Sequence, residues 1–229
     1  MRRILALFLI IATLAASLSL FSCGGGERER DYNEEELLKE AEKLIKQADL
    51  LNEIFYGKGI SYDELSASSY GNYKQALIFD LEKYGFFSIS ELKEKAETVF
   101  TKGYSENIFS TILDSIKDDD DNVRYFARYI EVREEEEADG VIFVSTTYTP
   151  LYDGEIEYDY STLSVYEVKG ERITVSVKAT ITTSDNKVQS TNKRITLIEE
   201  DLGWRIDSPS YIVYNEYKDR YEELDKELD

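Results

Sequence analysis

The sequence predicts an α+β domain in which N-terminal helices pack on a curved, mainly antiparallel β-sheet. The chain has 229 residues, of which 42% are apolar, enough for one domain with its own core. Residues 33–56 repeat apolar side chains at helical spacing, whereas residues 172–182 alternate apolar and polar side chains. Helical patterns therefore precede strand patterns along the chain, which is typical of the α+β class.

The clearest strand pattern covers residues 172–182. Its apolar positions are Ile173, Val175, Val177, Ala179 and Ile181, and Thr, Ser or Lys stand between them. This period of two predicts one buried face and one wet face. At roughly 3.3 Å per residue the strand is about 35 Å long, and a strand of that length is expected to curve.

The flanking segments predict a meander around this strand. Strands are expected at about 163–168, 187–199 and 204–206, with turns at Lys169-Gly170, at 184–186 and up to Gly203. Trp204 is the only Trp in the chain and alternates with Leu202 and Ile206, so we expect its ring in the core.

The first residues predict a targeting signal. A basic start, Met1-Arg2-Arg3, precedes an apolar run that extends to Leu18, as in a secretory signal peptide. Residues 20–23 (Leu-Phe-Ser-Cys) resemble a bacterial lipobox, in which the Cys is lipidated, and Cys23 is the only Cys of the chain. We therefore expect a signal peptide at 1–22 and a diacylglycerol anchor on Cys23, which supplies the two acyl chains that stable anchoring requires. The expected location is extracytoplasmic, on the bacterial cell membrane.

Residues 24–32 read as a flexible tether with a reach of roughly 15–18 Å, so the domain would lie close to the membrane. Removal of residues 1–22 takes away two arginines and no acidic residue, so the formal charge of −20 becomes −22. Such a charge repels phosphate polymers, and nucleic acid is not an expected partner.

The domain is expected over residues 33–210 and begins with a long helix at 33–56. Asn33 can cap this helix, and Gly57 and Gly59 end it. One apolar stripe marks the face toward the core: Leu37, Ala41, Leu44, Ile45, Ala48, Leu51 and Phe55.

The segments after this helix predict shorter elements. Residues 60–73 read as a loop, and residues 76–81 fit either a helix or a strand. Helices are expected from a cap at Ser90 to about 101 and again over 105–116. Strands follow at 123–132 and 141–148, then a Tyr-rich loop at 151–160; the last segment, 211–229, reads as a peripheral helix or a frayed tail.

Acidic runs separate several of these elements. The run Asp118, Asp119, Asp120 and Asp121 lacks the alternating ligands, central Gly and final Glu of a calcium loop, so it reads as a solvated turn. Residues 134–139, which begin with Glu134 and Glu135, read as a hairpin tip. No metal site and no cofactor are expected.

The composition restricts catalysis. The chain contains no His, which excludes Ser-His and Cys-His pairs and imidazole metal ligands. A carboxylate pair such as Glu155 and Asp159 remains as an enzymatic alternative acting on a sugar. The favoured expectation is no enzyme and no catalytic residue.

Three stretches carry a resemblance to a known family: residues 88–101 (Ser-Ile-Ser-Glu-Leu-Lys to Val-Phe-Thr), 128–131 (Arg-Tyr-Ile-Glu) and 202–211 (Leu-Gly-Trp-Arg-Ile-Asp-Ser-Pro-Ser-Tyr). The chain resembles small lipid-anchored Firmicute proteins grouped with the inhibitors of peptidoglycan DL-endopeptidases, over roughly residues 60–212. Helices followed by a long meander also look like the cystatin-like or NTF2-like roll, which hosts many functions. The resemblance implies a domain that plugs the cleft of a wall-cutting endopeptidase.

We therefore expect a non-catalytic, cell-surface protein-binding module whose partner is an endopeptidase or another envelope protein. Its contacts are expected from loops at one end of the sheet, with these residues as acidic rims: Asp118, Asp119, Asp120, Asp121, Glu134, Glu135, Asp153, Glu155 and Asp159. The alternative is a carrier of a small ligand or glycan in a cavity between sheet and helices. Its mouth would be lined by Tyr148, Tyr152, Tyr158, Tyr160 and Tyr166.

Overall fold

The structure is a computed structural model that describes residues 32–66, 69–114, 116–117, 123–124, 127–133 and 140–215. The predicted signal peptide, Cys23 and residues 216–229 lie outside the described residues. Among the residues described, no helix combines the length and apolar composition needed to cross a membrane. The class is α+β, as predicted, with helices and two antiparallel four-stranded sheets.

The long first helix is confirmed as α2 (Glu34–Phe55). The backbone N–H groups of Glu35 and Glu36 donate to Asn33 Oδ1 at 3.1 and 3.4 Å, which caps the helix as expected. All seven residues of the predicted stripe are buried.

The shorter helices differ from their predicted bounds. Helix α4 (Ile89–Glu97) is capped by Ser88, whose Oγ accepts a hydrogen bond from Glu91 N, and not by Ser90. The reason is a capping-box pattern in which the Ser stands three residues before the Glu. Helix α5 (Lys102–Ile112) likewise begins before the predicted residue 105, because Thr101 Oγ1 accepts from Tyr104 N.

The ambiguous segment at 76–81 is resolved as the start of helix α3 (Ile78–Tyr84). Gly85 ends this helix in the left-handed region at φ 70°, a conformation that glycine adopts without strain. The predicted loop at 60–73 is partly wrong, because it contains β1 (Ser69–Tyr70) and the start of β2 (Tyr73–Gln75).

The predicted meander forms the larger sheet, in the order β10-β9-β8-β7. Its strands are β7 (Gly154–Lys169), β8 (Arg172–Thr183), β9 (Val188–Glu200) and β10 (Gly203–Ile206). The five apolar residues predicted to face the core from β8 are all buried. The predicted loop at 151–160 is wrong, because β7 begins at Gly154 and alternates half-buried Ile156 and Tyr158 with exposed Glu155 and Glu157.

The remaining strands form a separate sheet, ordered β1-β2-β6-β5, so the expectation of one curved sheet was too simple. It contains β5 (Tyr129–Val132) and β6 (Val141–Ser145), while β3 (Ile116–Lys117) pairs with β4 (Val123–Arg124). The predicted strand at 123–132 is thus divided between two ladders. Arg128 N donates to Ile112 O at 2.7 Å, so the chain bonds to the end of α5 before β5 begins.

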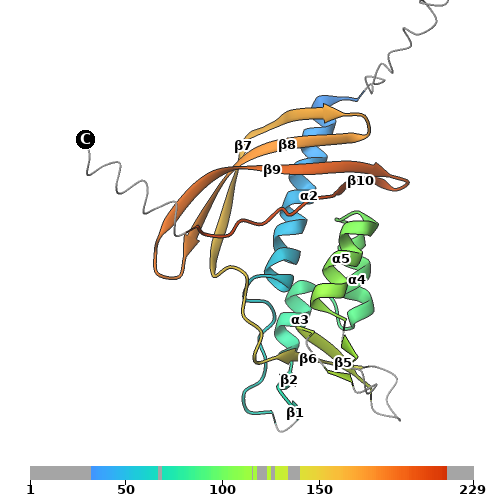
Figure 1. Cartoon of the computed structure of the whole chain (residues 1–229), viewed down its shortest axis with the longest axis vertical. Helices are drawn as coiled ribbons and strands as arrows, with labels where there is room; N and C mark the ends of the chain where they lie inside the picture. The colour runs from blue at the N-terminus through green and yellow to red at the C-terminus, as the bar shows by residue number, and fades with distance from the viewer. Residues whose placement is uncertain are drawn as a thin grey trace, which may run out of the picture. The chain divides into compact units, whose positions relative to one another are not determined.

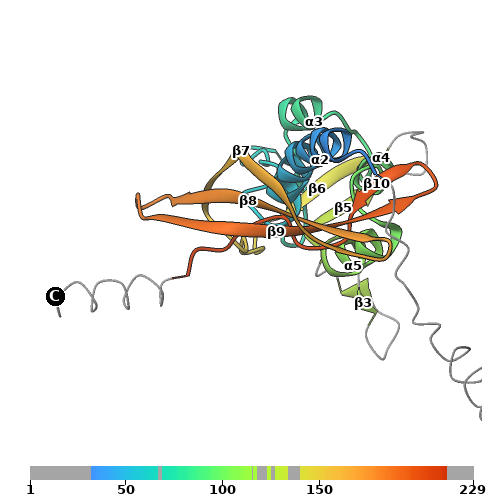
Figure 2. The same cartoon turned by 90° about the horizontal axis from the view of Figure 1, so that it is seen from above.

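Helix α2 packs against β7 and β10 and crosses the larger sheet, and Figure 1 shows the smaller sheet and α3 beyond the C-terminal end of this helix. Seen from above in Figure 2, α2 lies on one side of the strands β7, β8 and β9. A bridge from Phe100 to Ile206 ties the segment between α4 and α5 to β10. The core therefore lies between the apolar stripe of α2 and the inner face of β8.

Trp204 corrects one expectation. Ile206 is fully buried, but Trp204 is only half-buried and Leu202 is 87% exposed in the turn before β10. The alternation fails there because the turn carries Leu202 away from the core. The described part of the tail, residues 211–215, is not helical, although Ile212 packs on Tyr152 and Ile181.

Candidate functional site

A groove beside α3 is the most distinctive surface feature of the described residues. It has a volume of about 490 Å³ and is walled by α3, the start of α4 and the ladder of β5 and β6. We call it the apolar groove; its apolar lining comprises Ala76, Ile78, Leu81, Phe87, Val141 and Ile142.

Large apolar side chains stand exposed on and around this groove. Ile78 is 61% exposed and Phe79 is 74% exposed, and Leu77 and Phe87 are exposed as well. Helix α3 has only seven residues and buries only Leu81, so its other apolar side chains have no core to join. Clustered exposed apolar residues of this kind mark interaction surfaces, whereas single ones are ordinary.

Two carboxylates, Glu91 and Glu131, line this groove, and Asp80 stands on α3 outside its lining; the backbone fixes all three. Asp80 Oδ2 accepts from Ser61 N at 2.7 Å, Glu91 Oε2 from Phe87 N at 2.6 Å, and Glu131 Oε2 from Ile89 N at 2.9 Å. Arg133 forms an ion pair with Glu131 at 2.9 Å. The apolar groove therefore has a preorganised, mainly acidic rim.

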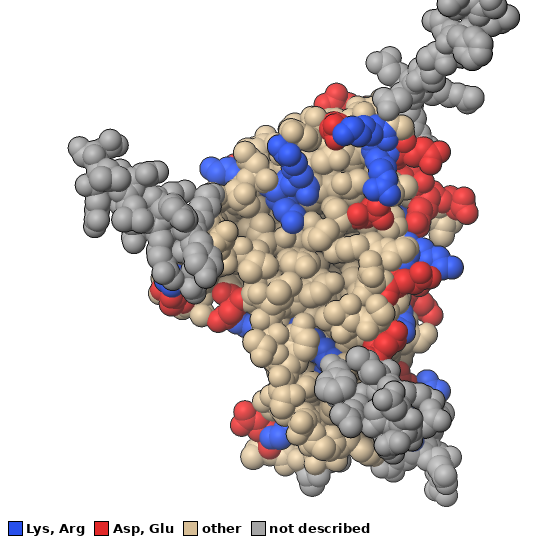
Figure 3. Space-filling view, in the orientation of Figure 1, with Lys and Arg blue, Asp and Glu red and all other residues tan. Residues whose placement is uncertain are grey.

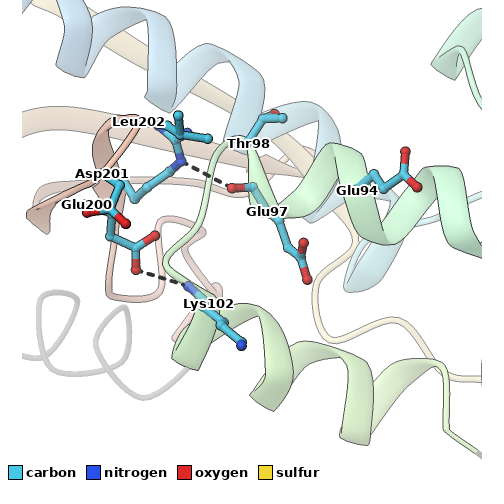
Figure 4. A pocket seen from close by; sticks show the side chains of 8 residues that line it. Glu94, Glu97, Thr98, Lys102, Glu200, Asp201 and Leu202 are labelled. Atoms are coloured by element: carbon cyan, nitrogen blue, oxygen red, sulfur yellow. Dashed lines mark hydrogen bonds between the residues drawn. The ribbon is translucent and has the colours of Figure 1, made fainter.

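A second groove, of about 990 Å³, lies between α4, α5 and the turn from β9 to β10 (Figure 4). We call it the acidic groove, since Glu94, Glu97, Glu200 and Asp201 line it beside Lys102 and Arg205. Arg205 Nε donates to Glu97 O at 3.1 Å and Lys102 N to Glu200 Oε1 at 3.3 Å, so part of its polar lining is already bonded. The described residues contain no group of three or more His, Cys, Asp or Glu that could hold a metal ion.

The charges on the molecule are unevenly distributed. On the face shown in Figure 3, acidic side chains gather mostly toward the right-hand edge, interspersed with basic ones, and the centre carries little charge. Electrostatic contacts on this face would therefore come from its rims.

The predicted site residues on β7 do not form a catalytic pair. Glu155 and Asp159 are exposed on the same face of β7, four residues apart, which at roughly 3.3 Å per residue separates them by about 13 Å. Glycosidase carboxylates lie about 5–9.5 Å apart. Asp153 is exposed, accepts from Ser184 Oγ at 2.6 Å and lies 3.6 Å from Lys58 Nζ.

The other predicted contact residues, Asp118, Asp119, Asp120, Asp121, Glu134 and Glu135, lie outside the described residues. Strands β5 and β6 pair antiparallel, and Val132 lies opposite Val141, as in the two strands of a hairpin. The structure thus brings none of the predicted acidic residues together into a described site.

The tyrosines that were predicted to line the mouth of a ligand cavity are engaged in packing and hydrogen bonds. Tyr148 OH donates to Phe55 O at 3.0 Å, Tyr158 OH donates to Ser210 O, and Tyr152 stacks on Tyr211 with ring centroids 6.2 Å apart. Burial raises the pKa of Tyr152 and of Tyr158, as expected for phenols in an aromatic cluster. The ring of Tyr160 lies 6.1 Å from that of Tyr158, and Arg194 lies 3.8 Å above the ring of the exposed Tyr166.

Sequence reasoning missed Asp49 on α2. Burial, and secondly the charge of Glu53, raise its pKa from an ordinary value of 3.8 to about 6. The signal was present in the helical spacing, because Asp49 follows the buried Ala48 and stands three residues before the buried Asn52. We interpret Asp49 as a carboxylate that the packing of α2 on β7 buries, at a cost to its charged form.

Comparisons with protein-family models, with curated proteins and with solved structures found no significant match to this chain.

Proposed function

We propose that this protein is a non-catalytic binding module held at the outer surface of a bacterial membrane through a lipid on Cys23. The observation that carries the proposal is the apolar groove, whose lining includes the exposed Ile78 and Phe87, with the exposed Phe79 next to Ile78 on α3. An apolar centre inside a polar rim is the usual anatomy of a protein interface. The wide separation of Glu155 and Asp159 supports a binding role over glycoside hydrolysis.

We further propose the finer fold and target that the sequence suggested: a cystatin-like or NTF2-like roll that inhibits a peptidoglycan DL-endopeptidase. The packing of α2 on the antiparallel strands β7–β10 supports the roll. The formal charge of −20 supports a basic protein partner, because opposite charges steer such proteins together.

An inhibition titration tests this function. We expect the purified chain to slow peptidoglycan hydrolysis by a DL-endopeptidase and to reach its full effect near equimolar concentration. The association rate should fall between low and physiological salt, where screening shortens to about 8 Å. Ile78→Ser should weaken inhibition, while Leu202→Ser, which changes an exposed apolar residue elsewhere, should not. Absence of inhibition by several such enzymes at roughly tenfold molar excess would reject the inhibitor role.

A further inference from the structure

We propose that the apolar groove binds a basic, amphipathic segment of its partner protein, with an apolar side chain seated between Ile78 and Phe87 and Lys or Arg side chains on the acidic rim. This inference rests on the proposed function and specifies the chemistry of the partner at that site.

The apolar part of the inference follows from exposure. Leu77, Ile78 and Phe79 are consecutive at the start of α3, and all three side chains are exposed although each of them is apolar. Phe87 approaches from the segment before α4 and lines the same groove as Ile78. Large side chains that flank a concave surface are the usual anchors of binding energy.

The basic part follows from the fixed charges. The carboxylates of Asp80, Glu91 and Glu131 each accept a backbone N–H and so keep their positions without a partner. Among these three, only Glu131 has a described ion pair, with Arg133. A Lys or Arg placed beside Glu91, which lines the groove, would therefore gain a charge-assisted contact with little ordering of the rim.

The same charges argue against a second copy of this chain as the occupant. Two copies would bring like-charged rims together on molecules that each carry a formal charge of −20. An anionic lipid surface would be repelled for the same reason.

The position of the groove also fits a partner protein. Helix α2 has 22 residues, which corresponds to about 33 Å, and α3, which walls the groove, lies beyond its C-terminal end (Figure 1). The chain leads to the proposed lipid anchor from the opposite end of this helix. Asn33, where the described domain begins, is therefore at the end of α2 away from α3, so a partner at the groove need not contact it.

Binding of two synthetic peptides to the full chain tests the inference. The first is a helical peptide of Lys and Leu with one apolar face; the second has the same Lys residues but Ser in place of Leu. Fluorescence anisotropy should show that the Lys/Leu peptide binds and that the Lys/Ser peptide binds at least tenfold more weakly. Ile78→Ser and Phe87→Ser should each weaken binding of the Lys/Leu peptide about tenfold. Glu82→Lys, which reverses an exposed charge one helical turn after Ile78 on α3, should weaken it severalfold.

Two matched variants, Leu202→Ser and Val188→Ser, remove exposed apolar side chains far from the groove in sequence and should bind as the unchanged chain does. Circular dichroism melting should be the same for all variants, because these side chains are exposed. Equal affinity for both peptides would show diffuse charge attraction and overturn the inference. Equal weakening by Leu202→Ser, which changes a residue that lines the acidic groove, would place binding in that groove and also overturn it. Binding to neutral phosphatidylcholine vesicles that is lost in Ile78→Ser would also overturn it, in favour of a lipid surface. Peptide binding at the groove without endopeptidase inhibition would reject that enzyme as target and leave the groove assignment intact.

Discussion

Replacing Arg128 with alanine is expected to lower the free energy of unfolding by about 3–5 kcal/mol. Arg128 is only 3% exposed, and its Nη2 donates to Gly57 O at 2.7 Å, just beyond the end of α2. Its guanidinium lies 4.3 Å from the ring centre of Tyr148 and 5.4 Å from that of Tyr129. The substitution would remove this bond, both cation–π contacts and the packed stem, and leave a cavity.

Arg128 matters because α2 has no basic residue in its last turn. The carbonyl groups at a helix C-terminus carry partial negative charge, and a cation there is stabilising. The same end is held by Tyr129 OH, which donates to Ile54 O at 2.7 Å. Gly59 approaches so closely that an added Cβ would lie 2.1 Å from Arg128 Nη2, which explains the glycine at this position.

A second variant, Arg128→Met, separates charge from shape at this position. Nε and Nη1 are buried without a hydrogen-bond partner among the described residues, so burial of the charge itself is unfavourable. Arg128→Met keeps most of the packed volume and should cost only about 1–2 kcal/mol. Chemical denaturation measures these differences. A loss below about 1 kcal/mol for Arg128→Ala would show that Arg128 does not hold the end of α2.

Replacing Asp49 with asparagine is expected to raise the free energy of unfolding at pH 7 by about 1–2 kcal/mol. The folded state raises the pKa of Asp49 from 3.8 to about 6, through burial first and Glu53 second. A shift of this size corresponds to about 3 kcal/mol, which we reduce because the carboxylate is partly exposed. Burial raises the pKa values of the neighbouring phenols of Tyr152, Tyr158 and Tyr160, and the charge of Asp49 raises them further.

The pH dependence has a definite sign. Below about pH 3.8, Asp49 is protonated in the folded and the unfolded states and gives no penalty. Between that pH and about 6 the unfolded state loses the proton first, so the penalty on the folded state grows, and it is complete above about 6. The advantage of Asp49→Asn should therefore appear between these values in denaturation curves. Asp201→Asn, an exposed control, should show little change; an equal gain in that variant would mean that net charge alone is responsible.

Strand β8 of the larger sheet was predictable from the sequence. One face of this strand is buried, and burial of one face makes apolar residues alternate with polar ones. Strand β7 also alternates in its sequence, but its acidic and Tyr residues and the turn-like Asp153-Gly154 suggested a loop. Only its pairing with β8 shows that this segment is a strand. The apolar groove was not predictable from local pattern. Ile78 and Phe79 look like core residues in sequence, and their exposure follows from the short α3 and the position of the smaller sheet. Arg128 depends on contacts with residues about 70 positions earlier in the chain, which no local spacing reveals.

Amide hydrogen exchange of the full chain, with and without the Lys/Leu peptide, tests most directly the claim that the apolar groove is the binding surface. The account predicts slower exchange on binding at residues 76–91 and 140–142, which form the walls of that groove. Residues 94–102 and 200–205, which wall the acidic groove, should exchange at unchanged rates. Protection confined to the acidic groove or to the outer face of β7–β9, with none at α3, would contradict it.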